Sequence, residues 1–255
     1  MTSPLFSLSH GIVEYKQRNK QLNFFQITHN QIQLNPKSQN SLALDDVSLK
    51  IYEGDRIGVI GLNGAGKSTL LKVVSGVLPP VSGTVTWNSK VTSLLNSSLG
   101  MDLNLSGRDN LIIRSMLLGY SKEHALDHIE FFAEWTELGH KINEPVSTYS
   151  DGMRARLAFV VNTQISEGIL VIDEGIGAGD ASFQAKAQIR LKQFFSHSNS
   201  ILIASHSIEF LREFCTRYIL MHNGKIVLDG PYQSAMNSYQ KIISEKVTGH
   251  KNEKD

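Results

Sequence analysis

The chain has 255 residues, of which 41% are hydrophobic and 19% charged, so it can bury the core of one large domain without disulfides or a metal cluster. Its 25 Lys and Arg residues against 24 Asp and Glu residues give a net charge of +1, which excludes the general electrostatic attraction that nucleic-acid binding needs. The single cysteine, Cys215, excludes an internal disulfide, and we expect a buried core thiol.

The N-terminal residues lack the basic segment and apolar run of a secretory signal, and no apolar stretch approaches the ~20 residues that span a bilayer. We therefore expect a soluble chain that takes part in a membrane process only by docking on a partner.

Residues 16–40 are rich in Gln and Asn and are predicted to form an irregular loop or hairpin. Alternating apolar residues over 47–51 and an apolar run over 57–60 then predict two strands. A helix over 70–78 and strands over 84–87 and 91–95 are predicted next.

Apolar residues from about Gly107 to Leu138 have helical spacing and few β-branched runs, which predicts an inserted helical lobe. Strands and helices alternate again afterwards, and Asn223-Gly224 predicts a tight hairpin turn between the last two strands. The later predicted elements are strands over 169–172, 201–204, 218–221 and 225–229, a helix over 232–245, and a polar tail over 247–255.

The segment Gly61-Leu-Asn-Gly-Ala-Gly-Lys-Ser-Thr69 matches the P-loop pattern, directly after a predicted buried strand and at the start of a helix. Glycines allow the backbone N–H groups to point at phosphate oxygens, while Lys67 adds a positive charge and the Ser68 hydroxyl can hold Mg²⁺. The residues predicted to bind ATP here are Gly61, Asn63, Gly64, Ala65, Gly66, Lys67, Ser68 and Thr69.

Paired carboxylates follow the apolar strand predicted over 169–172. We expect Asp173 to approach the metal ion and Glu174 to polarise the attacking water. His206 follows the strand predicted over 201–204, where strand ends meet the ligand in open α/β sheets, so we expect it to contact the γ-phosphate. Glu174 and His206 are thus the predicted catalytic residues.

A second phosphate-binding device is predicted at Tyr149-Ser-Asp-Gly-Met-Arg154, which offers a hydroxyl, a glycine backbone and a helix N-terminus. One nucleotide would not need both devices on the same side. His124 and His128 lie four residues apart on one helix face but lack a third ligand, so we interpret them as solvated rather than metal-binding.

The P-loop, Ser150 to Met153, Asp173-Glu174, Asp180 and His206 together resemble ABC ATPases in order and spacing, over about residues 42–235. The resemblance implies an α/β fold with an ABC-type P-loop NTPase core, an antiparallel β subdomain and an inserted helical subdomain at about 97–165. It implies one nucleotide-binding domain over 1–246.

By the same resemblance, the chain forms a homodimer that sandwiches two ATP molecules, so that the P-loop of one subunit faces the signature motif of the other. The matched positions are Ser150, Asp151, Gly152 and Met153 for the signature, Asp180 for the D-loop and His206 for the switch histidine. Asp151 and Met153 stand where Gly and Gln are commonest in the family.

Two further positions depart from the family pattern or leave alternatives open. No Gln occurs between Gln39 and Gln164, so Asn96 or Ser97 takes the approximate place of the Q-loop glutamine. The aromatic residue that stacks on adenine is expected to be Tyr15, with Phe24 or Phe25 as alternatives and a core role open for each.

A narrower resemblance is carried by the segments 93–95, 105–110, 149–159 and 179–183, which look like those of ATPases that export bacterial surface polysaccharides of the O-antigen, capsule or teichoic acid type. It implies a shorter member of that group, peripheral on the cytoplasmic face of the inner membrane. The implied partners are a transmembrane permease subunit and, through it, a lipid-linked polysaccharide, and no nucleic acid.

Three alternatives remain at this point. The chain could export drugs or lipids, or it could be a soluble ABC ATPase acting in translation or on DNA. A P-loop kinase is the third, but it would not explain the signature motif or His206.

Overall fold

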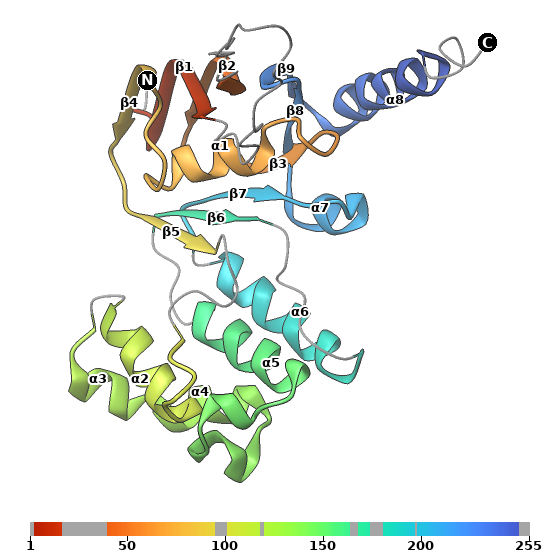
Figure 1. The fold of residues 1–255 in the computed structure, drawn as a ribbon. Coiled ribbons are helices and arrows are strands. Elements are labelled where there is room, and N and C mark those ends of the chain that lie inside the picture. The colour runs from red at the N-terminus through yellow and green to blue at the C-terminus, as the bar shows by residue number, and fades with distance from the viewer. Residues whose placement is uncertain are drawn as a thin grey trace, which may run out of the picture.

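The computed structural model describes residues 3–16, 40–94, 101–117, 120–163, 168–173, 181–196 and 198–249. This part of the chain contains two β-sheets, a lobe of helices, and further helices that pack on or follow the sheets (Figure 1). The family fold expected from the sequence is therefore present, with mixed α/β layers and a separate antiparallel sheet.

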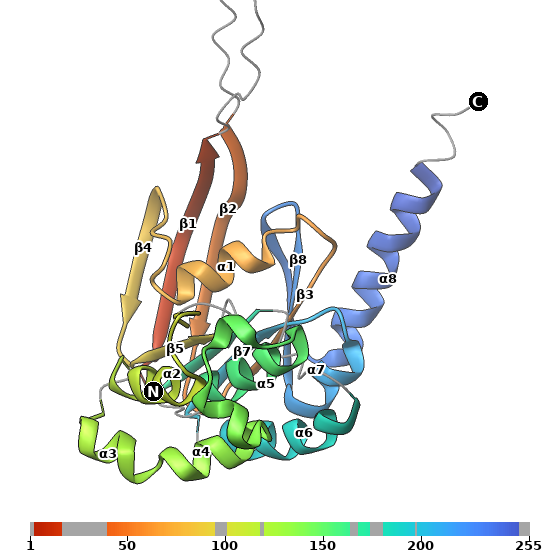
Figure 2. The same ribbon diagram turned by 60° about the horizontal axis from the view of Figure 1, so that its bottom comes forward.

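The antiparallel sheet has three strands, β1 (Phe6–Lys16), β2 (Asn40–Ile51) and β4 (Ser82–Trp87). Hydrogen bonds give the order β2-β1-β4, and Figure 2 shows the three strands side by side in this order. One face packs on the core through alternate residues such as Leu8 and Leu49, as the two-residue repeat of a half-buried strand requires.

The second sheet has six strands in the order β5-β6-β7-β3-β8-β9, of which only β9 is antiparallel to its neighbour. Helices or the other sheet cover both faces, so the central strands are continuous apolar runs. The strands are β5 (Val91–Leu94), β6 (Ile169–Ile172), β7 (Ser200–Ala204), β3 (Arg56–Ile60), β8 (Arg217–His222) and β9 (Lys225–Gly230).

Helix α1 (Lys67–Val74) lies between the two sheets, and its apolar residues share one core with both of them (Figure 1). The sequence predicted a helix over 70–78. The helix instead begins at Lys67, because Gly66 with φ 103° serves as N-cap, and it ends before Gly76, whose φ of 70° is the left-handed conformation typical of helix ends.

The helical lobe lies on the side of the six-stranded sheet that faces away from α1 (Figure 1). Helix α6 (Ala181–Ser196) shares one apolar core with the lobe and with strands β6 and β7. The helical pattern predicted over 107–138 is divided into three helices, because Ser121 caps a new helix and Glu137 ends the last with φ 56°. The lobe contains α2 (Gly107–Leu117), α3 (Lys122–Asp127), α4 (Ile129–Thr136), 3₁₀ turns at Gly139–Asn143 and Val146–Thr148, and α5 (Asp151–Asn162).

Three more helices, α6 (Ala181–Ser196), α7 (Ile208–Phe214) and α8 (Tyr232–Gly249), follow β6, β7 and β9. Helix α8 extends away from the body in both ribbon views and continues past Glu245, where the sequence pattern placed its end (Figures 1 and 2). Cys215 directly follows α7 and is 7% exposed, and burial raises the pKa of its thiol to about 12, so the buried core thiol is confirmed.

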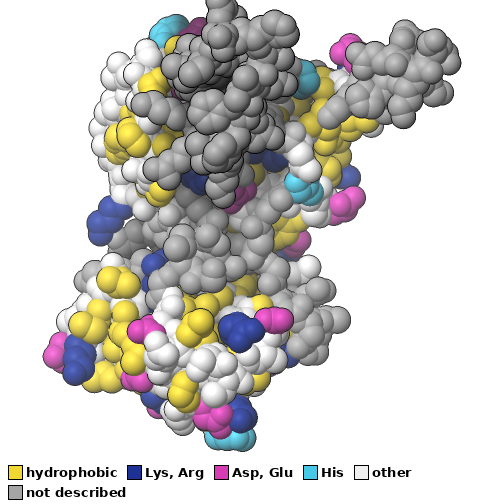
Figure 3. Space-filling view, in the orientation of Figure 1, with side chains coloured by type: hydrophobic (Ala, Val, Ile, Leu, Met, Phe, Trp, Pro, Cys, Tyr) yellow, Lys and Arg dark blue, Asp and Glu magenta, His cyan; other side chains and the backbone are white. Residues whose placement is uncertain are grey.

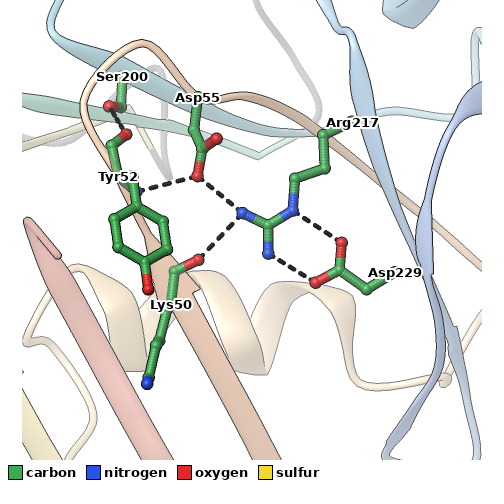
Figure 4. Close-up of polar contacts among 6 residues, drawn as sticks. All are labelled: Lys50, Tyr52, Asp55, Ser200, Arg217 and Asp229. Carbon is green, nitrogen blue, oxygen red and sulfur yellow. Dashed lines mark hydrogen bonds and ion pairs between the residues drawn. The ribbon is translucent and has the colours of Figure 1, made fainter. Parts of the chain in front are cut away.

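Arg217 at the start of β8 ties three segments together (Figure 4). Its guanidinium donates to both carboxylate oxygens of Asp229 on β9 at 2.6 and 2.7 Å, and to Asp55 Oδ2 at 2.7 Å. It also donates to the Lys50 carbonyl oxygen at 3.1 Å, and the hydrogen bond with Asp229 is the main cause of the raised pKa of Arg217. The network fixes the turn between β2 and β3 against the β8–β9 hairpin.

We expect Arg217→Ala to lower the free energy of unfolding by about 1–2 kcal/mol, because it removes a bidentate ion pair that is only 26% exposed on the arginine side. Urea denaturation measures the loss. Lys192→Ala is the matched control, since its ion pair with Glu213 is 60% exposed at the lysine and should contribute less than about 0.5 kcal/mol. Equal losses in the two variants would contradict a stabilising role for the network.

Among the residues that the structure describes, no helix combines the length and the apolar character needed to cross a bilayer.

Candidate functional site: a phosphate loop at the sheet edge

The loop between β3 and α1 has the conformation that its glycines permit. Gly61, Gly64 and Gly66 have φ values of 152°, 80° and 103°, in the region that side chains disfavour. A Cβ on Gly61 would collide with the Met221 carbonyl oxygen, and one on Gly66 would lie 2.7 Å from the Ala43 carbonyl oxygen. The loop is therefore packed tightly against β8 and β2, and larger residues at these two positions would displace it.

Lys67, the first residue of α1, is 8% exposed. Its Nζ donates to the carbonyl oxygens of Gly61 at 2.8 Å and Leu62 at 3.2 Å, so the ammonium group is held across the loop. A positive charge fixed in this way, together with the N–H groups at a helix N-terminus, forms a strong binding site for a phosphate group.

A cleft of about 420 Å³ opens over this loop. It brings together P-loop residues with Tyr15, Asp173 and His206, which are far apart in the sequence. The residues that line it are Tyr15, Ser41, Leu42, Ala43, Asn63, Gly64, Ala65, Gly66, Lys67, Ser68, Thr69, Asp173 and His206.

Sheet topology explains why Asp173 and His206 meet the loop. Strands β6, β7 and β3 are parallel neighbours, and Asp173, His206 and the P-loop follow their carboxyl ends. Ligands of open α/β sheets bind at this edge. The arrangement expected from the strand ends is thus observed, with Asp173 half-buried and His206 exposed.

The donor set is suited to Mg²⁺. Ser68 and Asp173 line the same cleft, and a hydroxyl and a carboxylate are oxygen ligands that this ion prefers, alongside phosphate oxygens and water. His206 lies in the same cleft, where an imidazole could contact the end of a phosphate chain.

Tyr15 lies near the end of β1 at the rim of the cleft and is 41% exposed. The Tyr15 hydroxyl is 3.4 Å from Thr69 Oγ1. This exposed position is compatible with stacking on a nucleobase, which stays a prediction. The alternatives Phe24 and Phe25 lie outside the described residues.

Ser150, Asp151, Gly152 and Met153 start helix α5 in the helical lobe and are absent from the lining of the cleft. Ser150 is the N-cap of α5, and its Oγ accepts a hydrogen bond from the Met153 N–H at 3.3 Å. Arg154 bonds to the Asp151 carboxylate and donates to the Tyr149 carbonyl oxygen at 2.5 Å, which stiffens this helix start. The residues predicted as a second phosphate-binding device thus belong to another surface of the same chain.

Several predicted residues lie outside the part that the structure describes. These are Glu174, Asp180, and the Q-loop candidates Asn96 and Ser97. The rings of His124 and His128 are stacked 4.2 Å apart, and His128 Nδ1 lies 2.9 Å from the His124 carbonyl oxygen.

Sequence reasoning missed Ser41, Leu42 and Ala43, which line the cleft from β2. The pairing of Tyr15 with Ser41 brings them there. The loop or hairpin predicted over 16–40, most of which lies outside the described residues, gave no register for this pairing, so Ser41 to Ala43 carried no signal of their own.

Comparisons with known proteins agree with this geometry. Residues 44–177 match the family model described as "ABC transporter". The chain belongs to the ABC transporter family. The matched range includes the P-loop, the start of α5 and Asp173. As a member of this family, the chain is an ABC ATPase that binds and hydrolyses ATP.

Relatives of this ABC ATPase include "ABC transporter protein AbcA" of Aeromonas salmonicida, 37% identical over 82% of this chain and 69% of that protein. "Teichoic acids export ATP-binding protein TagH" of Staphylococcus haemolyticus is 36% identical over 82% of this chain and 80% of that protein. The expected family, fold and ATPase activity are confirmed.

Among solved structures, a dimeric ATP-binding cassette in a post-hydrolysis state with ADP and Pi is similar, with a TM-score of 0.65. It is 18% identical, and the match covers 89% of this chain and 98% of that one. This likeness concerns the fold.

Proposed function

We propose that this ABC ATPase powers the export of a lipid-linked cell-surface polysaccharide. The observation that carries the proposal is the 36% identity to a teichoic acids export ATP-binding protein over 80% of that protein's length. The segments 105–110 and 149–159, which resemble polysaccharide exporters, lie in the helical lobe and support it. An O-antigen-like glycan carried by a lipid is the substrate class that we propose.

The cleft supports a division of labour among its residues. Lys67 and the P-loop N–H groups would bind the phosphates, while Ser68 and Asp173 would hold Mg²⁺. When bound, that ion neutralises charge on the β- and γ-phosphate oxygens. Glu174, next to Asp173, would accept a proton from the attacking water, and His206 would contact the γ-phosphate.

We propose further that two copies close over two ATP molecules. Ser150 to Met153 are exposed or half-buried at a helix N-terminus, and they lie away from the cleft of their own chain. In a head-to-tail dimer they would meet the nucleotide of the other subunit, with Asp180 between the two sites. The fold likeness to a dimeric cassette is compatible with this arrangement.

Ser150→Arg should abolish ATP occlusion at one of the two sites when this chain is paired with a Lys67→Ala chain. Both defects fall on one interface site in that heterodimer, so the other site stays intact. Trapped nucleotide per dimer, measured after gel filtration, should be half that of the wild type. Equal loss at both sites would contradict the head-to-tail arrangement.

Ser147→Arg is the control for the added charge, because Ser147 is exposed in the 3₁₀ turn just before the helix. Loss of the Ser150 cap alone costs about 1 kcal/mol of stability. Thermal unfolding of the Ser150→Arg chain therefore has to show a folded protein before the nucleotide count is interpreted.

The partner of the dimer would be a transmembrane permease subunit at the cytoplasmic face of the inner membrane. Exposed hydrophobic side chains gather on the helical lobe (Figure 3). They include Leu103, Ile113, Met116, Leu117, Leu126 and Phe131. Such a surface is typical of protein contacts. Closing and opening of the dimer would move the two lobes and give the permease two states to follow.

Deletion of the gene in its native host tests the substrate. Surface polysaccharide should disappear from the cell surface, and the lipid-linked precursor should accumulate inside, as measured by glycan staining and by extraction of lipid-linked sugars. The wild-type gene should restore the surface glycan, whereas the Lys67→Ala gene should not. Unchanged surface glycan in a host without a second exporter would contradict polysaccharide as the substrate, but it would not contradict the ATPase activity.

A further inference from the structure

The turn of the β8–β9 hairpin touches the P-loop directly. The Gly224 N–H donates to the carbonyl oxygen of Ala65, a P-loop residue, at 3.0 Å. The Gly224 carbonyl oxygen accepts from the Asp45 N–H of β2 at 2.9 Å. One buried glycine therefore links the phosphate loop to the strand that lines the other side of the nucleotide cleft.

Packing at this junction is as close as the hydrogen bonding. The Ala43 carbonyl oxygen would lie 2.7 Å from a Cβ on Gly66 and 3.0 Å from a Cβ on Gly224. Met221, at the end of β8, contributes its carbonyl oxygen against Gly61 and its Cε against Gly66. The hairpin and β2 thus form a cradle around the first and last glycines of the loop, and Figure 1 shows the hairpin beside β2.

The turn itself leaves little freedom. Asn223 and Gly224 have φ values of 48° and 77°, and His222 pairs with Lys225, so the hairpin has the two-residue turn in which both residues are left-handed. Lys225 Nζ forms an ion pair with Asp45 at 2.9 Å over the same junction. A turn of this kind holds its backbone N–H and C=O groups in a fixed direction.

We propose that Gly224 is a positioning residue for ATP binding, which sets the shape of the P-loop through Ala65 and the Ala43 carbonyl. The inference rests on the proposed nucleotide site at the P-loop. A methyl group at position 224 would press on backbone atoms of Ala43 and Leu44, at 3.0 to 3.4 Å, and backbone atoms cannot rotate away. The displacement would reach Gly66, because the Ala43 carbonyl lies against both glycines.

Gly224→Ala should raise the KM for ATP about tenfold, because a misplacement of about 1 Å can cost about 10²-fold and the shift expected here is smaller. Turnover at saturating ATP should change less than threefold. The matched control is Gly54→Ala, because Gly54 has a similar φ of 84° but open space within 4 Å of a Cβ. That variant carries the same backbone strain without the contact, so its KM should be that of the wild type.

Steady-state phosphate release over an ATP series measures both parameters, and thermal unfolding of each variant accompanies it. An unchanged KM in Gly224→Ala, or an equal rise in Gly54→Ala, would overturn the inference. Lys67→Ala distinguishes a wrong positioning role from a wrong nucleotide site. If Lys67→Ala loses ATP binding while Gly224→Ala keeps it, the P-loop is the nucleotide site but Gly224 does not position it. Normal ATP binding by Lys67→Ala would contradict both the nucleotide site at the P-loop and the positioning role of Gly224.

Hydrogen exchange in the wild-type protein tests the same link if Gly224→Ala does not fold. Nucleotide should order the P-loop and slow exchange of the Gly224 amide, which bonds to Ala65, by at least threefold. The Gly54 amide, which donates to the Asn199 carbonyl oxygen at 2.7 Å, should not respond. Exchange at Gly224 that ADP leaves unchanged would contradict the coupling.

Discussion

Replacing Lys67 with alanine should lower the affinity for ATP and the rate of hydrolysis at least about a hundredfold. Removal of one preorganised donor near a reacting group has effects of this size. The ammonium group is nearly buried and held by the Gly61 and Leu62 carbonyl oxygens, so its position is set before the nucleotide arrives. Nucleotide binding by fluorescence titration and phosphate release measure the two losses.

Lys72→Ala is the control and should leave both quantities unchanged, because Lys72 is in the last turn of the same helix and does not line the cleft. Lys67→Arg should recover little, because a planar guanidinium is larger and cannot replace a compact ammonium across the loop. Wild-type ATP binding by Lys67→Ala would show that the cleft is not the nucleotide site.

Glu174→Gln should reduce ATP turnover about 10²- to 10⁴-fold while ATP binding is retained, because an amide keeps the shape of the carboxylate but cannot accept a proton. Glu174 immediately follows Asp173, which lines the cleft at the end of β6. In the proposed mechanism, the variant should accumulate as an ATP-bound dimer, which light scattering detects.

Glu134→Gln tests whether any lost carboxylate has this effect, since Glu134 lies on the exposed side of α4 in the helical lobe. Its turnover should equal that of the wild type. Near-normal turnover by Glu174→Gln in a purified assay would instead assign the proton acceptor to another residue.

Local chemistry made the centre of the cleft predictable from the sequence. The P-loop needs glycines with positive φ and a lysine at the start of a helix, and these are properties of nine consecutive residues. Asp173 and His206 were placed correctly at the sheet edge because each follows a short apolar run, and parallel strands bring such ends together.

Contacts between distant segments were not predictable in the same way. Ser41 to Ala43 reach the cleft through antiparallel pairing with β1, and Gly224 reaches the P-loop from a hairpin that the sequence marked only as a tight turn. Pairing partners and carbonyl directions depend on the whole fold, and a single sequence contains no local signal for them.

Helix ends show the same limit on a smaller scale. The apolar pattern over 70–78 missed the first turn at Lys67, because the residues of that turn are polar although Lys67 and Thr69 are buried; only the P-loop motif indicated that a helix starts there. Apolar spacing over 107–138 likewise did not show that Ser121 begins a separate helix, although its hydroxyl accepts the His124 N–H at 3.2 Å.

The strand order of the large sheet has a consequence for biosynthesis. Strand β3, which leads into the P-loop, pairs on one side with β7 and on the other with β8, both of which are synthesised only after the whole helical lobe. A nascent chain that has left the ribosome only as far as α6 thus holds an apolar strand with neither neighbour, a state prone to aggregation. We therefore expect chaperones to protect the chain during this interval, and nucleotide to assist folding only after Ser200 to Gly224 have been made.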